Sequence, residues 1–346
     1  MDTSQEKFGQ FDGQDVIKYT LTNDHNVSIS VLNYGGIWQA FMVPGQDGKR
    51  HNLLLSADNF ADLHAAGYSI NRVIGPTAGR IENGEFTING QTYQVDRNEN
   101  GNTLHGGSTG WGDGHFWNVT VDADRGTITL TQTFSPADDT YPGNKEVAVV
   151  YTLGEDDSVT LDFYGTTDAN TLFNPTNHTY WNLADESEPT IEGLELQLNS
   201  KYHLAVKDGK LPTGEKIANA GTPYDFSQLT NLGAALNEML KTPEQGFDDY
   251  FEVTPSATLA HEPIAILHDP KSNRTLKMFS DRNGLVMFST DGISSDVKLN
   301  RPGRPWMALA LEGQTLPDSP HHFDFGDVTL RPNDPKHYQI HYEIEY

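Results

Sequence analysis

The chain has 346 residues, and its 23 Lys and Arg against 48 Asp and Glu leave a formal net charge of −25. This charge repels phosphate backbones and anionic lipid headgroups, so nucleic acid and membrane surfaces are disfavoured as partners. The complete lack of cysteine excludes disulfides, thiolate nucleophiles and zinc sites built on sulfur.

Alternating apolar and polar residues predict β-strands along most of the chain. In residues 86–95 the pair Asn89-Gly90 interrupts such an alternation, which predicts a hairpin with a type I′ turn. A helical spacing of apolar residues is persuasive only in residues 229–241. The other predicted strands are residues 27–33, 127–134, 147–153, 159–163, 194–198, 285–289, 307–311, 327–330 and 338–346.

These elements favour an all-β fold, a large single-domain antiparallel β-sandwich that spans residues 1–346. Glycine and proline are scattered between the strands and mark no linker, and the polar residues 1–13 are interpreted as a flexible tail. Neither a signal peptide nor a long apolar run is visible, so we expect a soluble, cytoplasmic protein. We expect a monomer or a homodimer.

Two histidines lie in stretches more polar than a strand core requires. His105 is followed by Gly106 and Gly107, which leave the imidazole uncovered and suit a ligand, although a histidine beside an ordinary turn would look the same. His178 is surrounded by amides and aromatic rings that suit the hydroxyl edges and apolar face of a sugar. It could equally be a hydrogen-bonded neighbour of core aromatic residues. Its surroundings are Asn174, Asn177, Tyr180, Trp181 and Asn182.

Carboxylates mark two further stretches. Glu312 follows the apolar strand 307–311, where burial would raise its proton affinity as a general base requires. An acid at a strand end that faces solvent is the alternative. Asp248 and Asp249 are adjacent, and because side chains alternate along a strand only one of them can face a given ligand.

Taken together and in order, these stretches resemble the aldose 1-epimerase family, the galactose mutarotases. The resemblance covers residues 75–320 and rests on five motifs. They are Gly-Arg-Ile at 79–81, Leu-His-Gly-Gly at 104–107, Asn-Pro-Thr-Asn-His-Thr-Tyr-Trp-Asn-Leu at 174–183, Gly-Phe-Asp-Asp-Tyr-Phe at 246–251 and Leu-Glu followed by Pro-Asp-Ser at 311–319.

The resemblance implies a cleft on a concave sheet face in which α and β anomers of a free aldose such as galactose or glucose interconvert. By the resemblance, Glu312 is the general base, His178 the general acid, and Arg80, His105 and Asp248 bind sugar hydroxyls, with neither a metal nor an organic cofactor. Such catalysis near neutral pH requires a protonated His178 beside an ionised Glu312, which predicts a bell-shaped pH profile.

Three departures from the family pattern bear on substrate range. Pro76 and Gly79 stand where many members have Arg and Asn, and Asp249 replaces a usual His. Part of the polarity around Arg80 is therefore missing or supplied from elsewhere. Trp111 is a candidate platform near His105.

Other functions fit some of these features. Two carboxylates, Asp248 and Glu312, could serve a glycoside hydrolase, and a β-sandwich could bind sugar without catalysis. A relative acting on hexose 6-phosphates should carry extra cations for the phosphate. His321, His322 and Asp324 could supply metal ligands, but adjacent strand residues diverge, so we expect no metal site.

Overall fold

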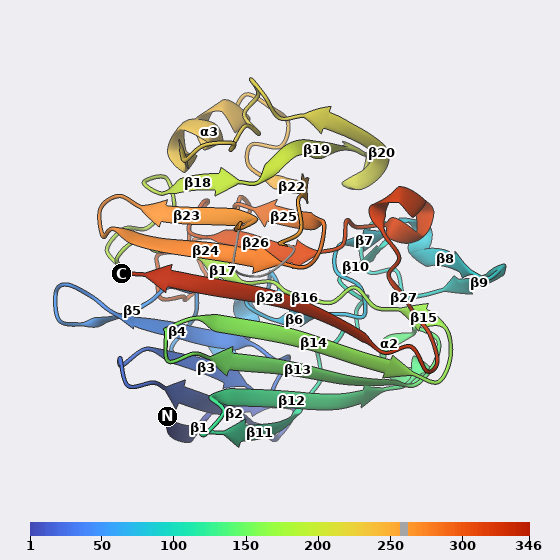
Figure 1. Ribbon diagram of the computed structural model, residues 1–346, viewed down its shortest axis with the longest axis horizontal. Helices are drawn as coiled ribbons and strands as arrows, with labels where there is room; N and C mark the ends of the chain where they lie inside the picture. Colours follow the sequence, from blue (N-terminus) through green and yellow to red (C-terminus); the bar gives the residue numbers. More distant parts are fainter. Residues whose placement is uncertain (257–261) are drawn as a thin grey trace.

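Antiparallel β-sheets make up most of the computed structural model, which describes residues 1–256 and 262–346. The largest sheet in this part of the chain has nine strands, and Figure 1 shows it running from β12 through β28 to β18. In spatial order its strands are β11 (Asn118–Asp122), β12 (Thr127–Phe134), β13 (Lys145–Leu153), β14 (Val159–Thr167), β28 (Lys336–Glu345), β24 (Arg274–Ser280), β23 (Ala265–Asp269), β18 (Glu195–Leu198) and β21 (Thr230–Asn231).

A six-stranded sheet packs against the nine-stranded one and carries much of the site described below. Its order is β17 (Tyr180–Trp181), β26 (Leu309–Gln314), β25 (Gly284–Phe288), β22 (Asp248–Val253), β19 (Ser200–Lys207) and β20 (Leu211–Ala218). Leu285, Leu309 and Leu311 of this sheet share one buried apolar cluster with Val149 and Ile340 of the nine-stranded sheet. The main core therefore lies between the two sheets, as in a sandwich.

The amino-terminal part forms a third sheet, and short pairs and helices complete the structure. The third sheet runs β1 (Asp2–Phe11), β2 (Gln14–Thr22), β3 (Ser28–Leu32), β4 (Trp38–Pro44), β5 (Arg50–Asn52). The two-stranded pairs are β10 (Thr103–Leu104) with β7 (Arg80–Ile81), β16 (Thr176–Asn177) with β6 (Val73–Ile74), β15 (Thr171–Leu172) with β27 (Thr329–Leu330), and β8 (Glu85–Ile88) with β9 (Gln91–Gln94). The helices are α1 (Phe60–Ala66), α2 (Pro136–Asp139) and α3 (Leu232–Met239), and short 3-10 turns span Glu82–Gly84, Ser319–His321 and Phe323–Phe325.

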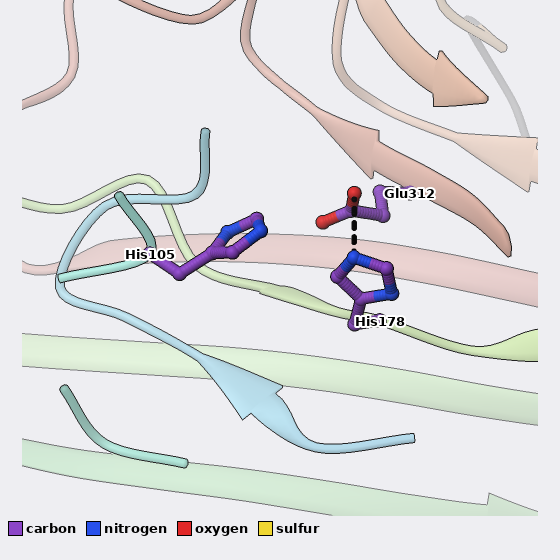
Figure 2. A group of neighbouring side chains, drawn as sticks. All are labelled: His105, His178 and Glu312. Atoms are coloured by element: carbon purple, nitrogen blue, oxygen red, sulfur yellow. Dashed lines mark ion pairs between the residues drawn. The ribbon is translucent and has the colours of Figure 1, made fainter. Parts of the chain in front are cut away.

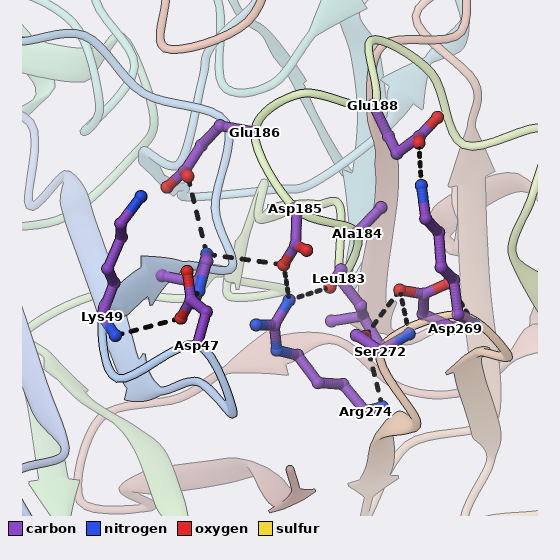
Figure 3. A network of polar contacts seen from close by, with 12 residues as sticks. Asp47, Lys49, Leu183, Ala184, Asp185, Glu186, Glu188, Asp269, Ser272 and Arg274 are labelled. Atoms are coloured by element: carbon purple, nitrogen blue, oxygen red, sulfur yellow. Dashed lines mark hydrogen bonds and ion pairs between the residues drawn. The ribbon is translucent and has the colours of Figure 1, made fainter.

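A polar network ties the segment that follows β17 to the sheets (Figure 3). Arg274 of β24 donates to the carbonyl of Leu183 at 2.8 Å and to Asp185 Oδ1 at 2.9 Å. His51 of β5 approaches the same carboxylate at 3.5 Å, and Lys271 pairs with Glu188. These contacts hold together three segments that are far apart in the sequence.

The all-β prediction is confirmed, and so are the predicted hairpin and helix. Asn89 and Gly90 have φ of 52° and 80°, as a type I′ turn requires, and join β8 to β9. Helix α3 lies inside the predicted range 229–241 and begins after Asn231, whose side chain accepts from Ala234 N–H. Each of the other predicted segments overlaps an observed strand.

The structure corrects the prediction of a flexible tail at residues 1–13. Residues Asp2–Phe11 form β1, which pairs with β2 from Asp2 opposite Thr22 to Phe11 opposite Gln14. Most of its side chains are exposed, and the strand is held by backbone pairing together with Phe8 and Phe11, which pack against a buried apolar cluster. The turn is Asp12-Gly13, with φ of 47° and 80°.

Within the described residues, the helices are all too short or too polar to cross a bilayer.

Candidate active site

Side-chain alternation along β26 places Glu312 on the face of the six-stranded sheet that lies away from the main core. Leu309 and Leu311 pack into the core between the sheets, so Ala310 and Glu312 point to the other face. The apolar run 307–311 predicts a strand that ends just before Glu312, whereas the structure places Glu312 inside β26, where it is 2% exposed. The alternative of an acid facing solvent at a strand end is therefore wrong.

The neighbouring strands continue this face in register. Val286 of β25 lies opposite Glu312, and Tyr250 of β22 lies opposite Val286. Asp248 lies opposite Phe288 in the same pair of strands. A row of side chains from three adjacent strands thus forms the floor of the site.

Two loops bring basic groups over this floor. Thr103 and Leu104 of β10 pair with Ile81 and Arg80 of β7, so the short ladder carries Arg80 and leads directly into His105. His178 follows β16, and its backbone N–H donates to the carbonyl of Arg72 at 3.0 Å. Local pairing of loop segments, more than sheet membership, therefore positions these three side chains.

The side chains surround an open cavity of about 230 Å³. All five residues expected to act in the site, Arg80, His105, His178, Asp248 and Glu312, line it. The other lining residues are Tyr68, Ser69, Gly79, Glu99, Leu104, Tyr180, Tyr250, Val286 and Phe288.

His178 and Glu312 form a buried pair in the cavity wall. Nε2 of His178 lies 3.4 Å from Glu312 Oε1, and Figure 2 shows the ring and the carboxylate facing each other, with His105 directed toward them. The ring of His178 stacks on Tyr180 with centroids 4.8 Å apart. Among the described residues, His178 Nδ1 and Glu312 Oε2 find no hydrogen-bond partner, so the pair retains bonding capacity.

Burial moves the pKa values of this pair in opposite directions. Desolvation lowers the pKa of His178 to about 4. Desolvation, with a further contribution from the charge of Asp248, raises the pKa of Glu312 to about 8. Between these values the pair holds one proton, and in the unliganded protein that proton resides on Glu312. This is the reverse of the expected protonated His178 beside an ionised Glu312.

Acceptor groups of three residues surround the guanidinium of Arg80. Its Nε donates to Glu99 Oε2 at 2.6 Å and Nη2 to Glu99 Oε1 at 3.0 Å, a bidentate pair. Nη1 donates to the hydroxyl of Tyr250 at 2.8 Å, and Nη2 lies 3.6 Å from Asp248 Oδ2. The guanidinium is therefore immobilised at the cavity wall before any ligand arrives.

The tautomer of His105 follows from one backbone contact. Nδ1 accepts from Gly79 N–H at 3.3 Å, and burial lowers the pKa of the ring well below its usual value. A neutral ring whose Nδ1 accepts must carry its proton on Nε2, which makes Nε2 a donor. His105 itself has φ of 53°, a left-handed conformation set by the tight loop.

The structure distinguishes the two adjacent aspartates. Asp248 lines the cavity, whereas Asp249 points to the opposite side of β22 and is 3% exposed. Desolvation raises the pKa of Asp249 to about 7. Of the two, only Asp248 is placed to contact a ligand in the cavity.

The aromatic and amide residues around His178 are largely structural. Trp181 is fully buried in the main core, so its expected role as a plate for a sugar is wrong. Trp111 is also fully buried, stacked on Phe134 at 5.2 Å, and does not line the cavity. The amides bond to backbone or core groups: Asn174 to Thr315, Asn177 to Tyr151 and Asn182 to Met307.

Four further residues of the site were not predicted from the sequence. Glu99 and Tyr250 hold Arg80, and Tyr68 and Phe288 supply apolar surface with rings 6.4 Å apart. Tyr250 could have been found, because it stands two residues after Asp248 and so shares its face of the strand. No local pattern distinguishes Glu99 from the other acids of its turn.

Gly79 also has a structural explanation. A Cβ at this position would lie 2.7 Å from Pro317 Cβ, and its φ is 71°. A larger residue, such as the Asn of many family members, would be strained here.

One group of three side chains in the described ranges could hold a metal ion. The ligand atoms of His105, His178 and Glu312 all lie within 4.8 Å of one another. His321 instead bonds to Asp318 at 2.6 Å.

Known proteins that are similar to this chain include sugar epimerases. The family model for aldose 1-epimerase matches residues 18–343. A maltose epimerase from Levilactobacillus brevis is 39% identical, with 99% of both chains covered, and an aldose 1-epimerase from Streptococcus thermophilus is 34% identical over all of this chain and 98% of its own. The crystal structure of a galactose 1-epimerase from Lactobacillus acidophilus superposes with a TM-score of 0.85 at 27% identity, covering 99% of this chain and 98% of that one. The protein belongs to the aldose 1-epimerase family of carbohydrate isomerases.

Proposed function

We propose that the protein interconverts the α and β anomers of free aldoses such as glucose and galactose, with Glu312 and His178 as the acid/base pair. The observation that carries this proposal is the pair itself, an imidazole and a carboxylate buried in the cavity wall with Nε2 and Oε1 3.4 Å apart. Opening a pyranose requires one proton to leave O1 and one to reach the ring oxygen O5. A pair with one proton contains the one acid and one base that this exchange needs.

In the proposed mechanism Glu312 accepts the proton of the C1 hydroxyl while His178 donates a proton to O5. The C1–O5 bond breaks and an aldehyde forms at C1. Rotation about the C1–C2 bond presents the other face of the aldehyde to the C5 hydroxyl, and ring closure returns both protons. No covalent intermediate with the protein is needed.

The protonation of the unliganded pair adds one requirement. Because the proton resides on Glu312 before binding, it must pass to His178 when the sugar enters. Sugar hydroxyls can provide hydrogen bonds that desolvation has removed, and these bonds favour the charged forms of both groups. The distance of 3.4 Å is close enough for this transfer after a small approach of the two groups.

Hydroxyl recognition is assigned to Arg80, His105 and Asp248. Arg80 and the Nε2–H of His105 are donors, and Asp248, with a side chain 30% exposed, is an acceptor. The one cationic side chain among the described lining residues, Arg80, is already paired with Glu99. This supports a neutral sugar rather than a sugar phosphate.

The comparisons support a wider choice of sugar than monosaccharides. The relative from Levilactobacillus brevis is named a maltose epimerase, and the other two are named for aldoses or galactose. We therefore propose glucose, galactose and the reducing end of maltose as candidate substrates.

Polarimetry of freshly dissolved α-D-glucose and α-D-galactose tests the function. Wild type should accelerate the change in optical rotation, and Glu312→Gln should reduce the acceleration by about 10²-fold or more, the usual contribution of a positioned base. Glu252→Gln is a matched control, because Glu252 lies in the six-stranded sheet but pairs with Lys216 outside the cavity. Wild type that accelerates the mutarotation of neither of these sugars nor of maltose would overturn the proposal.

A further inference from the structure

A second hollow adjoins the active-site cavity. The two share Ser69, Leu104 and His105 in their walls, so they meet at the loop that carries His105. The second hollow extends to Arg72, Ser108 and Asp113 and has a volume of about 130 Å³. Eight of its lining residues do not line the first cavity, and none of the eight belongs to the acid/base or hydroxyl-binding set assigned above.

The hollow is lined by groups that can bind hydroxyls. Asp113 is 55% exposed and accepts from Arg72 Nη1 at 3.0 Å and from the hydroxyl of Tyr34 at 3.1 Å. Arg72 also contacts His64 Nδ1 at 3.3 Å. An exposed carboxylate held by an arginine and a tyrosine is a preorganised acceptor, as sugar recognition requires.

The loop between the two hollows is held in one place. Asn98 donates to the carbonyl of Leu104 at 3.0 Å and accepts from its N–H at 2.7 Å. The N–H of Ser108 donates to Asp96 at 2.7 Å. A Cβ on Gly110 would lie only 2.4 Å from the carbonyl oxygen of His105, so the loop is closely packed on itself. The loop wall that the two hollows share is therefore held in one conformation.

The proposed chemistry orients the sugar relative to this wall. With O1 at Glu312 and O5 at His178, the ring continues from O5 to C5, C4 and C6 on the side away from Glu312. His105 stands beside His178, with ring centroids 5.2 Å apart. C4 lies across the ring from C1, and C6 is attached to C5, so a second unit on O4 or O6 leaves the cavity away from the reacting carbon, whereas C2 lies next to C1.

We propose that this hollow is a second sugar subsite, which receives the non-reducing unit of a reducing disaccharide linked through O4 or O6 of the sugar being epimerised. The inference rests on the proposed function, because the orientation of the first sugar follows from the acid/base pair. Arg72, Ser108 and Asp113 supply its polar contacts.

Substitution of Ser108 separates this subsite from the catalytic cavity. Ser108 is exposed and lines only the second hollow, so Ser108→Tyr should fill that hollow and leave the first open. We expect kcat/KM for maltose to fall about tenfold, the cost of losing one favourable sugar contact, while kcat/KM for glucose stays within about twofold. Thr109→Tyr adds the same ring at the next exposed position, which lines neither hollow, and should change neither substrate.

Linkage specificity is an independent measurement on the wild-type protein. Maltose, linked through O4, and melibiose, linked through O6, should be epimerised at their reducing ends. Kojibiose, linked through O2, should react at least about tenfold more slowly, because its second unit points away from the hollow. The order of these three rates requires no variant and so is insensitive to misfolding.

The outcomes distinguish the subsite from the function on which it rests. If wild type accelerates neither glucose nor maltose, the proposed function fails. If it accelerates glucose, and Ser108→Tyr affects glucose and maltose equally or neither, the subsite is refuted while the function stands. Equal rates for kojibiose and maltose would refute it as well.

Discussion

The protein contains two buried pairs of opposite potential charge whose surroundings differ sharply. Lys145 and Asp139 lie 3.1 Å apart with both side chains 0% exposed, and His178 and Glu312 lie 3.4 Å apart at 7% and 2%. Burial and distance are nearly the same. The two pairs differ in how many other hydrogen-bond partners their polar atoms have.

Every charged atom of the first pair is occupied. Lys145 Nζ also donates to the carbonyls of Tyr141 at 3.1 Å and Gly143 at 2.8 Å. Asp139 accepts from Trp111 Nε1 at 3.1 Å and from the N–H of Tyr141 at 3.1 Å. Trp111 in turn packs under Gly75, where a Cβ would lie 2.0 Å from its ring. This pair anchors the core behind the site loops.

The second pair keeps one nitrogen and one oxygen without a partner in the part of the chain that the structure describes. Unsatisfied buried polar atoms cost stability. The cost is acceptable where a ligand later supplies the missing bonds, so the comparison separates a buried pair that stabilises the fold from one prepared for chemistry.

The largest expected effect comes from breaking the saturated pair. Asp139→Ala leaves the Lys145 ammonium buried without its carboxylate, which should lower the free energy of unfolding by about 3 to 5 kcal/mol. Urea denaturation followed by tryptophan fluorescence measures this loss. Adding Lys145→Met to Asp139→Ala should restore part of the stability, because the unpaired charge is gone. A loss below about 1 kcal/mol in the single variant would contradict the assignment.

Breaking the His178–Glu312 pair should reduce activity and leave stability intact. Glu312→Gln should reduce mutarotation by about 10²-fold or more without loss of stability. Because the folded-state pKa of Glu312 is raised to about 8, its contribution to stability is greatest below the unfolded value near 4.5 and is lost as pH rises through 8. The melting temperature of the variant relative to wild type should therefore rise from pH 5 to pH 8.5. A relative melting temperature that falls over this range would show that the ionised carboxylate is stabilised by the fold.

Next in size is the pH profile of kcat/KM. The pair should hold one proton only between about pH 4 and about pH 8, so the profile should be bell-shaped with limbs near these values. Asp248→Asn removes a charge that raises the pKa of Glu312, so the alkaline limb should move to lower pH. A profile that rises without an alkaline limb would refute the pair as the proton exchanger.

The two adjacent aspartates sharpen the comparison at one strand. Asp248→Asn should reduce kcat/KM by a factor that corresponds to about 1 to 3 kcal/mol, because it loses a hydroxyl contact. Asp249→Asn should leave kcat/KM within about twofold, since its side chain faces away from the cavity. Polarimetry at saturating and limiting sugar distinguishes KM from kcat. Equal losses of kcat/KM in both variants would contradict the assignment of Asp248, rather than Asp249, as the aspartate that contacts the sugar.

The smallest effect is expected at a partly exposed pair. Lys216 and Glu252 lie 2.8 Å apart on the six-stranded sheet, each side chain about 30% exposed. Glu252→Gln should change the free energy of unfolding by less than about 1 kcal/mol, because solvent screens the pair. Urea denaturation at low and high salt checks this. A loss of unfolding free energy as large as that of Asp139→Ala would mean that solvent exposure does not decide how much an ion pair contributes to stability.

Sequence by itself determined the fold class and the groups available for chemistry. Period-2 alternation identifies a strand locally, and Asn89-Gly90 identifies a turn, because both depend on the conformations of a few consecutive residues. Asp12-Gly13 carries the same turn signal, and with it β1 was predictable despite its polar composition. The motifs around His178 and Glu312 were readable for the same reason: they are short, continuous and chemically specific.

Only the tertiary structure decided how those groups act. The choice of Asp248 over Asp249 depends on which face of β22 meets the core, and the burial of Trp181 depends on the packing of two sheets. The bidentate contact between Glu99 and Arg80 joins residues 19 positions apart in sequence. Proton distribution in the pair depends on desolvation by the whole surrounding fold, so no local pattern of residues contains it.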